Sequence, residues 1–155
     1  MAEKIDVRPA TIVIKKDKVL AIKSKYGKEE FYLFPGGGVE FGETLRDAAI
    51  RETLEETGYK VEIIKPVYIN EYIDAKDKSR RVINLFFFAK LRGKRKNKIK
   101  NDGGKIKQIE WISIDKVKKI NIKPRLIKEN LEEDYKKKFN IVRYNVEYNN
   151  TLGDS

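Results

Sequence analysis

The chain of 155 residues contains no cysteine and no histidine, and only one tryptophan and one methionine. Without cysteine, disulfide bonds and thiol chemistry are excluded. Without histidine, no imidazole can act as a general base, a nucleophile or a metal ligand. Acid–base or metal chemistry must therefore rest on carboxylates, lysines or tyrosines. Carboxylate oxygens favour hard cations such as Mg²⁺ or Mn²⁺.

Long apolar runs are also missing. No stretch is long enough to span a bilayer, and the first residues, MAEKIDVRP, lack the apolar core of a signal peptide. We therefore expect a cytoplasmic protein with no membrane partner. The length favours a single domain over residues 1–148, followed by a frayed tail at 149–155. Nothing in the sequence distinguishes a monomer from a homodimer.

Positive charge dominates the composition. Lys and Arg number 35 against 24 Asp and Glu, so the formal net charge is +11 and the sequence pI is near 9.6. A basic chain favours anionic partners such as nucleotides, nucleic acid or membrane surfaces. Lys, Ile and Asn are abundant throughout the chain, so compositional drift is the alternative explanation of the charge.

Apolar periodicity and turn residues predict an ordered series of strands and helices. Predicted strands cover 11–14 and 19–22, which form a hairpin, then 31–34, 60–72, 81–91, 108–113 and 140–148. Predicted helices run from a Thr44 cap to about 57, through one turn at 115–119, and over 125–139 with Pro124 in its first turn. Gly58 stands where the left-handed C′ residue of the first helix is expected. Residues 24–30 read as a polar loop. The strand at 81–91 is apolar on both faces, which predicts a central strand covered on both sides.

The helix after Thr44 has acidic residues in its apolar sector. On a helical wheel of about 100° per residue, Glu52 and Glu56 fall among the apolar positions, whereas Arg51 and Glu55 lie towards the polar side. Two like charges four residues apart repel each other, and burying them is unfavourable without a compensating cation. Arg51 can reach Glu55 but not both inner carboxylates. A bound divalent cation is the simplest compensation, and a solvated Glu-rich face is the alternative.

Three consecutive glycines, Gly36–Gly38, precede this helix. They let the backbone approach a ligand closely, and a carbonyl group there would add an oxygen to a metal shell. A PGGG run by itself indicates no more than a turn. Its combination with the carboxylates at a fixed spacing indicates a site.

The stretch from Gly37 to Tyr59, GGVEFGETLRDAAIRETLEETGY, resembles the Nudix box of the Nudix hydrolases. Every glycine, glutamate and arginine of that motif is present, with Glu43 between the glycine turn and the RETLEETGY segment that begins at Arg51. The lead-in LFPG at 33–36 and Trp111 are also similar to the family pattern. Thr53 and Tyr59 stand where an aliphatic residue is more usual.

The resemblance implies an α+β Nudix fold, in which a mixed β-sheet lies between helices and a strand, a glycine loop and a catalytic helix follow one another. The implied reaction is hydrolysis of a nucleoside diphosphate linked to another moiety. The implied metal ligands for Mg²⁺ or Mn²⁺ are Glu52, Glu55, Glu56 and the Gly36 carbonyl. Glu43 and Arg51 would support them, Arg51 by holding a carboxylate in place.

The wheel supports Glu52 and Glu56 most strongly as ligands, because Glu55 lies at the polar edge beside Arg51. A glutamate of the box, or an acid from a distant loop, would take the proton of the attacking water. Asp102 and Glu110 are the candidates outside the box, and the alternative for each is a turn residue or an exposed strand residue.

The substrate is less well defined by the sequence. Size and simplicity favour the MutT-like group, which hydrolyses nucleoside triphosphates. ADP-ribose hydrolases of the family often have Pro near the position of Ala75, and dinucleoside polyphosphate hydrolases have a Tyr in the same region, where Tyr72 comes a few residues early. Neither absence excludes these activities. A broken box marks the non-catalytic nucleotide-binding modules, and this box is intact.

Six residues are candidates for contact with the substrate. Lys23 and Lys25 could meet phosphates, Arg81 and Asn84 a base or ribose, and Phe34 could stack on one of these, while Gly37 offers close backbone approach. The alternatives are solvated lysines, a cross-strand pair and a core aromatic. The basic segment at 90–107 is a candidate for binding RNA, as in Nudix enzymes that remove pyrophosphate from RNA 5′ ends. No aromatic residue interleaves that segment, so a stacking platform is missing.

Overall fold

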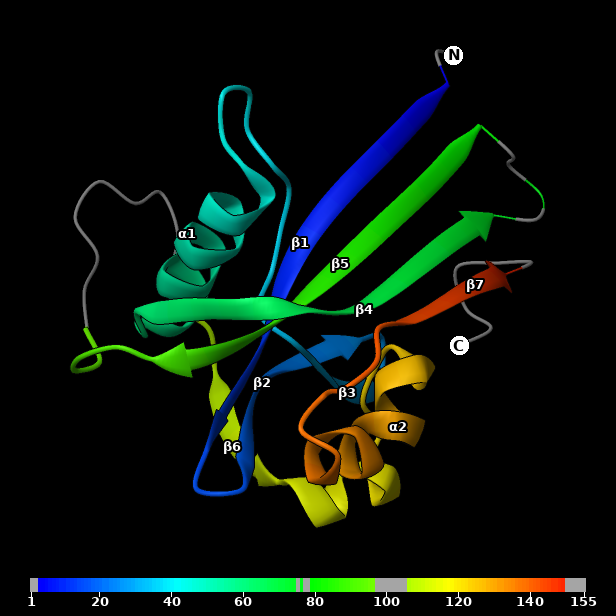
Figure 1. Cartoon of the computed structure of the whole chain (residues 1–155). Helices are drawn as coiled ribbons and strands as arrows, with labels where there is room; N and C mark the ends of the chain where they lie inside the picture. The colour runs from blue at the N-terminus through cyan, green and yellow to red at the C-terminus, as the bar shows by residue number, and fades with distance from the viewer. Residues whose placement is uncertain (1–2, 75, 77–78, 97–105, 150–155) are drawn as a thin grey trace.

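The computed structural model describes residues 3–74, 76, 79–96 and 106–149. Its elements are β1 (Lys4–Lys15), β2 (Lys18–Tyr26), β3 (Glu29–Leu33), α1 (Leu45–Thr57), β4 (Val61–Asp74), β5 (Arg80–Leu91), β6 (Ile109–Ser113), the 3₁₀ helix η1 (Ile114–Lys119), α2 (Arg125–Lys136) and β7 (Arg143–Asn149). The strands form one sheet in the order β3-β2-β1-β5-β4-β7, with β6 beside β2. The sheet contains both parallel and antiparallel pairs, which confirms the predicted mixed sheet of an α+β fold (Figure 1).

Strand β1 runs through the middle of the molecule and pairs with both β5 and β2 (Figure 1). It pairs in parallel with β5 from Lys4 to Val13, and its end pairs antiparallel with β2. Lys16 and Asp17 join β1 to β2, both with positive φ, at 49° and 60°. Two left-handed residues make a primed turn, whose twist matches that of a hairpin. The predicted hairpin is therefore confirmed.

The prediction of a polar loop at 24–30 is wrong. Strand β2 continues to Tyr26 and β3 begins at Glu29, so only Gly27 and Lys28 form the turn. Lys25 lies opposite Glu30 in this antiparallel pair. Opposite charges facing each other across an exposed pair of strands favour strand structure in a sequence without apolar alternation.

Strand β5 lies between β1 and β4, as predicted for a central strand. Its neighbouring residues Phe86 and Phe87 are both buried, but they belong to two different hydrophobic clusters. Phe86 packs in the cluster that contains Leu131 of α2, whereas Phe87 packs in the cluster that contains Ala49 of α1. Because successive side chains of a strand point to opposite faces, the two helices cover opposite faces of the sheet.

Helix α2 ends earlier than predicted. The apolar spacing predicted a helix to Phe139, but the helix stops at Lys136, and Lys138 and Phe139 have positive φ. Phe139 is nevertheless buried, because the turn brings its ring back onto the α2 side of the sheet. None of the helices described here is both long and apolar enough to cross a membrane. Asn149 pairs with Asp74 at the end of β7, and residues 150–155 lie outside the described residues.

Candidate functional site

Helix α1 is capped at its N-terminal end by Thr44 and at its C-terminal end by Gly58. The Thr44 hydroxyl accepts a hydrogen bond of 3.0 Å from the backbone N–H of Asp47. At the other end Gly58 has φ 77°, and its N–H donates to the carbonyl of Leu54 at 2.8 Å. Both caps agree with the sequence prediction. They fix the rotation of the helix and therefore the direction of its glutamates.

The glycine turn lies directly against Glu52 and Glu56. The backbone N–H of Gly36 donates to Oε1 of Glu56 at 3.1 Å. A Cβ atom built on Gly37 would lie 2.6 Å from each carboxylate oxygen of Glu52, so no side chain fits there without moving that carboxylate. Gly36 is held in turn by a bridge to Ala10 of β1. Strand β1 thus positions the turn, and the turn meets the two inner glutamates.

Burial of the three box glutamates follows the order that the wheel predicted. The side chain of Glu56 is 11% exposed and that of Glu52 is 18% exposed, whereas that of Glu55 is 38% exposed. The inner pair is therefore the part of the helix where carboxylates are removed from water. Such a pair requires positive charge nearby.

Arg51 supplies part of that charge. Its guanidinium donates to Glu43 through Nε at 2.8 Å and Nη2 at 3.0 Å, and Nη1 lies 3.0 Å from Glu52 and 3.3 Å from Glu55. Nη2 also donates to the carbonyl of Gly38 at 3.1 Å. Glu43 and then Glu52 raise the pKa of Arg51, and the hydrogen bonds from Arg51 lower the pKa of Glu43. Arg51 therefore ties α1 to the loop before it, and it does not reach Glu56.

Glu56 has a different partner, Lys107. The ammonium of Lys107 lies 3.1 Å from Oε2 of Glu56, and the backbone N–H of Lys107 donates to the carbonyl of Glu56 at 2.8 Å. Burial raises the pKa of the Glu56 carboxyl, while the hydrogen bond and charge of Lys107 oppose that rise. In the sequence, Lys107 is distinguished only as the last residue of the basic segment at 90–107. Sequence spacing gave no signal for this contact, which joins residues 51 positions apart.

The residue types at this site fit a hard divalent cation. The carboxylate of Glu56 meets the backbone of Gly36 and that of Glu52 lies against Gly37, and oxygen ligands of this kind suit Mg²⁺ or Mn²⁺. Among the described residues, no three acidic side chains already form a cluster that could hold a metal ion. Glu52 and Glu55 turn towards Arg51, and Glu56 turns towards Lys107. A metal ion would have to bind beside these resident cations or compete with them for the carboxylates.

The two departures from the family pattern both have polar partners. The hydroxyl of Thr53 lies 2.8 Å from that of Thr11 on β1, and it donates to the carbonyl of Ala49 at 2.7 Å. Tyr59 meets Trp111 edge to face at 5.5 Å, and Nε1 of Trp111 donates to the Tyr59 hydroxyl at 3.3 Å. Thr53 and Tyr59 therefore each pack with a polar partner, and these contacts hold α1 on the sheet.

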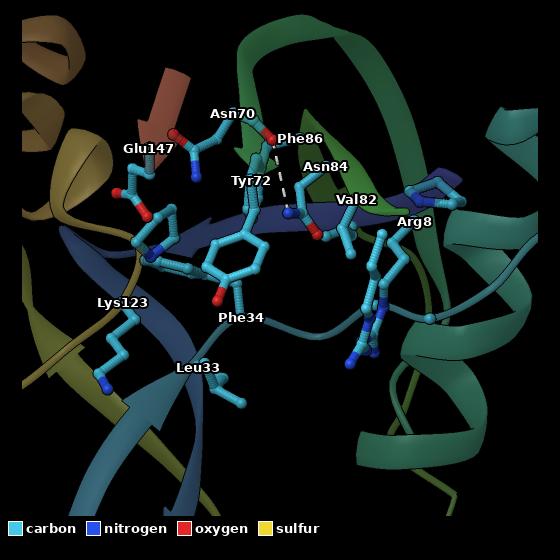
Figure 2. A pocket seen from close by; sticks show the side chains of 16 residues that line it. Arg8, Leu33, Phe34, Asn70, Tyr72, Val82, Asn84, Phe86, Lys123 and Glu147 are labelled. Atoms are coloured by element: carbon cyan, nitrogen blue, oxygen red, sulfur yellow. Dashed lines mark hydrogen bonds between the residues drawn. The ribbon is translucent and has the colours of Figure 1, made fainter. Parts of the chain in front are cut away.

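A cavity of about 290 Å³ lies beside the glycine turn, on the α2 side of the sheet (Figure 2). Its volume is at the lower end of the range for small-molecule sites, roughly 300–1,000 Å³. Apart from Gly36 and Gly37, the lining side chains include Arg8, Leu33, Phe34, Asn70, Tyr72, Arg80, Val82, Asn84, Phe86, Lys123 and Glu147. Aromatic and apolar groups make most of the wall, and a few polar groups converge on it.

The polar groups follow the sheet register. Arg8 of β1 lies opposite Asn84 of β5, Asn84 lies opposite Asn70 of β4, and Asn70 lies opposite Asn145 of β7. Asn84 donates to the Asn70 backbone carbonyl, and Asn145 donates to the Asn70 side-chain oxygen, both at 3.4 Å. Figure 2 shows Tyr72 in front of this row and Arg8 on the side nearest to α1. One row of the sheet thus carries the polar floor of the cavity.

The six predicted substrate contacts divide into two groups. Phe34, Gly37 and Asn84 line the cavity, and Lys23, Lys25 and Arg81 do not. Arg81 alternates with Arg80 and Val82 along β5, so its side chain points to the other face of the sheet. The period of two along β5 that places Asn84 at the cavity also places Val82 and Arg80 there. The positions of Tyr72, Asn70 and Glu147 at the cavity depend on the register of three strands. That register cannot be read from the sequence of one strand alone.

Of the two acids proposed as a base outside the box, the structure describes Glu110, whose hydrogen-bond partner lies outside the box. Glu110 lies on β6, and its carboxylate accepts a hydrogen bond from the hydroxyl of Tyr32. That hydrogen bond raises the pKa of Tyr32. Asp102 and Ala75 lie outside the described residues. A role for Glu110 or Asp102 in catalysis stays a prediction.

Comparison with known proteins identifies the family. A model described as the NUDIX domain matches residues 6–131. The chain is 34% identical over 103 residues to the m7GpppN-mRNA hydrolase dcap-2 of Caenorhabditis elegans, covering 64% of this chain and 12% of that protein. It is 36% identical over 85 residues to the ADP-ribose pyrophosphatase of Methanocaldococcus jannaschii, covering 53% of this chain and 48% of that protein. The chain thus spans less than half of the length of either relative.

Solved structures share the fold. A NUDIX hydrolase from Nitrosomonas europaea superimposes with a TM-score of 0.70 at 25% identity, over 91% of this chain and 93% of that one. The MutT protein from Bacillus halodurans superimposes with a TM-score of 0.68 at 21% identity, over 94% and 90% of the two chains. The second likeness is one of fold alone.

Proposed function

The chain belongs to the Nudix family, and from this premise we propose that it is a metal-dependent hydrolase of MutT type, which cleaves a phosphoanhydride bond of a nucleoside triphosphate. One observation carries the proposal. The cavity and the inner glutamates share the backbone of Gly36 and Gly37, which lines the cavity and contacts both carboxylates. A substrate in the cavity would therefore extend its phosphates across the glycine turn to Glu52 and Glu56.

The size of the cavity favours a single nucleoside with a short phosphate chain over a two-nucleoside substrate. Tyr72 and Phe34 offer aromatic surface to a base, and Asn84 offers an amide to its polar edge. Arg8 lies between the cavity and α1, where it would meet the phosphate chain (Figure 2). Guanidinium groups bind phosphate through paired N–H donors.

The inner glutamates give the site its chemistry. A divalent cation held there would neutralise the diphosphate and lower the pKa of a bound water. Glu52, Glu55 and Glu56 with the Gly36 carbonyl are the proposed ligands. Arg51 donates hydrogen bonds to Glu52 and to Glu43. Arg51 and Glu43 therefore orient the proposed ligands. A glutamate of the box would accept the proton of the attacking water.

The test is a substrate panel with purified protein, Mg²⁺ or Mn²⁺, and an EDTA control. The panel contains nucleoside triphosphates, oxidised nucleotides, ADP-ribose, dinucleoside polyphosphates, nucleotide sugars and 5′-triphosphorylated RNA. We expect metal-dependent release of pyrophosphate from a nucleoside triphosphate with the highest kcat/KM. Faster turnover of ADP-ribose or of a dinucleoside polyphosphate would overturn the MutT-type assignment. Tight binding of a nucleotide without hydrolysis of any panel member would overturn the enzymatic one.

RNA with a 5′ triphosphate is the second candidate substrate. Two observations favour it: the likeness to an mRNA hydrolase, and the basic residues Arg95, Lys96 and Lys107 beside the end of α1. A polyanion that contacts several of these residues loses affinity steeply with salt, whereas a mononucleotide does not. The RNA assignment therefore predicts a KM for triphosphorylated RNA that rises at least about tenfold between 50 and 200 mM salt. A flat KM over that range would exclude the basic segment as an RNA contact.

A further inference from the structure

The described ends of the basic segment are both fastened to the C-terminal end of α1. Nε of Arg95 donates to the carbonyl of Thr57 at 3.0 Å, and the backbone N–H of Lys96 donates to the carbonyl of Gly58 at 2.7 Å. On the return, the backbone N–H of Lys107 donates to the carbonyl of Glu56 at 2.8 Å. Helix α1 has no basic residue in its last turn. The segment therefore brings positive charge to the negative end of the helix dipole.

One of these cations reaches the metal site itself. Nζ of Lys107 lies 3.1 Å from Oε2 of Glu56, while the other carboxylate oxygen accepts from the N–H of Gly36. Backbone and ammonium thus take one oxygen each. The Gly36 bond is part of the fold, because the turn is pinned to β1, so Oε2 is the oxygen whose partner can change.

The two cations of the site differ in how firmly they are held. Arg51 donates to three carboxylates and a carbonyl, and its side chain is 24% exposed. The side chain of Lys107 makes a single ion pair among the described residues and is 56% exposed. A lysine ammonium on a flexible four-carbon stem can leave towards water at little cost. Arg51 is therefore a fixed part of the site, whereas Lys107 is replaceable.

We propose that Lys107 is a resident counter-ion of Glu56 that a divalent metal displaces. The inference rests on the proposed role of Glu56 as a metal ligand. Lys107 compensates the buried carboxylate when no metal is bound, and the metal takes its place on Oε2. The lysine therefore lowers the affinity of the site for the metal alone. It thereby favours loading of the metal together with an anionic substrate, because the released ammonium and the metal both attract phosphate.

The test measures metal binding directly, without turnover. Mn²⁺ affinity is determined by electron paramagnetic resonance of the free ion for the wild type, Lys107→Met and Lys107→Arg. Lys94→Met is the matched control, because Lys94 belongs to the same segment, is exposed, and makes no ion pair with a described carboxylate. We expect Lys107→Met to bind Mn²⁺ about three- to tenfold more tightly than the wild type. Lys94→Met should change the affinity about twofold or less, since salt screens an unpaired surface charge.

Lys107→Arg keeps the charge and should bind no more tightly than the wild type. Equal affinities for the wild type and Lys107→Met, or a weaker affinity for Lys107→Met, would overturn the inference while leaving the proposed hydrolase intact. Equal gains for Lys107→Met and Lys94→Met would also overturn it, because net charge alone would then explain the change. Wild-type protein that binds no Mn²⁺ would instead overturn the metal site on which the proposed function depends.

Discussion

Alanine substitutions at the three adjacent glycines, Gly36, Gly37 and Gly38, distinguish effects on the stability of the fold from effects on the candidate site. The most informative of these substitutions is Gly37→Ala. A methyl group on Gly37 would lie 2.6 Å from the two carboxylate oxygens of Glu52. Gly38 has no atom within 4 Å of the same position, and a methyl group on Gly36 would lie 2.5 Å from Cβ of Ala10. None of the three glycines has a positive φ, so alanine suits the backbone at each of them.

The expected sizes of the three effects follow from what must move. In Gly37→Ala the Glu52 carboxyl carbon, 2.4 Å from the added methyl group, must retreat by about 1.0 Å to reach ordinary contact at 3.4 Å. Displacements of about 1 Å in a catalytic site cost on the order of 100-fold in rate. Stability changes by about 1 kcal/mol or less, since only the partly exposed Arg51–Glu52 pair is disturbed. Gly36→Ala instead presses on β1, and such overpacking costs about 1–3 kcal/mol.

The assay pairs kcat/KM on the best substrate of the panel with unfolding in urea. Gly37→Ala should lose about 100-fold in kcat/KM with a nearly unchanged urea midpoint. Gly38→Ala is the control and should change neither quantity, and Gly36→Ala should lower the midpoint. Wild-type kcat/KM for Gly37→Ala, or an equal loss for Gly38→Ala, would refute the close approach of this turn to a working carboxylate.

Three further changes probe the cavity, the core and the support of the helix. Tyr72→Ala should raise KM for a nucleotide by about tenfold with kcat little changed, because base–aromatic stacking is worth about 1–3 kcal/mol; an unchanged KM would remove Tyr72 from the substrate site. Tyr68→Phe should lower the free energy of unfolding by about 1 kcal/mol in urea, since its hydroxyl donates to buried Asp134 at 2.6 Å, and an unchanged value would show that bond to be dispensable. Arg51 lowers the pKa of Glu43 from its ordinary 4.5. The stabilisation of the folded protein by the Arg51–Glu43 ion pair is therefore complete above pH 4.5, and it is lost as the pH falls through the lower pKa that Glu43 has in the folded state. Urea titrations at pH 6 and pH 3 should therefore give Glu43→Gln a smaller loss of stability between the two pH values than the wild type, and equal losses would contradict the ion pair.

Local patterns in the sequence were sufficient for much of the fold and for the burial order of the three box glutamates. The caps of α1 and the double-sided burial of β5 follow from short-range signals and are present as predicted. The wheel ranked Glu52 and Glu56 as more buried than Glu55, and their exposed fractions have that order. Helical periodicity alone determines these directions, so they need no knowledge of partners.

The cavity end of the site depends on which strands are neighbours. Arg8 and Asn84 meet because β1 and β5 pair in parallel, and no local pattern contains that register. Arg81 is the predicted contact, but Arg80 lines the cavity, and the two neighbours differ in the face of the sheet to which they point. Lys107 meets Glu56 because the basic segment returns to the end of α1. Long-range pairing of this kind is absent from the helical and strand periods that a single sequence displays.

The metal role of Glu56 is the central claim, and the most direct measurement is kcat/KM of Glu56→Gln with Mg²⁺ on the best nucleotide of the panel. Glutamine keeps the size of the side chain but removes the charge that would hold the cation. Glu62→Gln is the control, because Glu62 is an exposed glutamate of β4. The proposed site predicts a loss of at least about 100-fold for Glu56→Gln and none for Glu62→Gln. Equal turnover by Glu56→Gln and the wild type would contradict the assignment of Glu56 as a metal ligand.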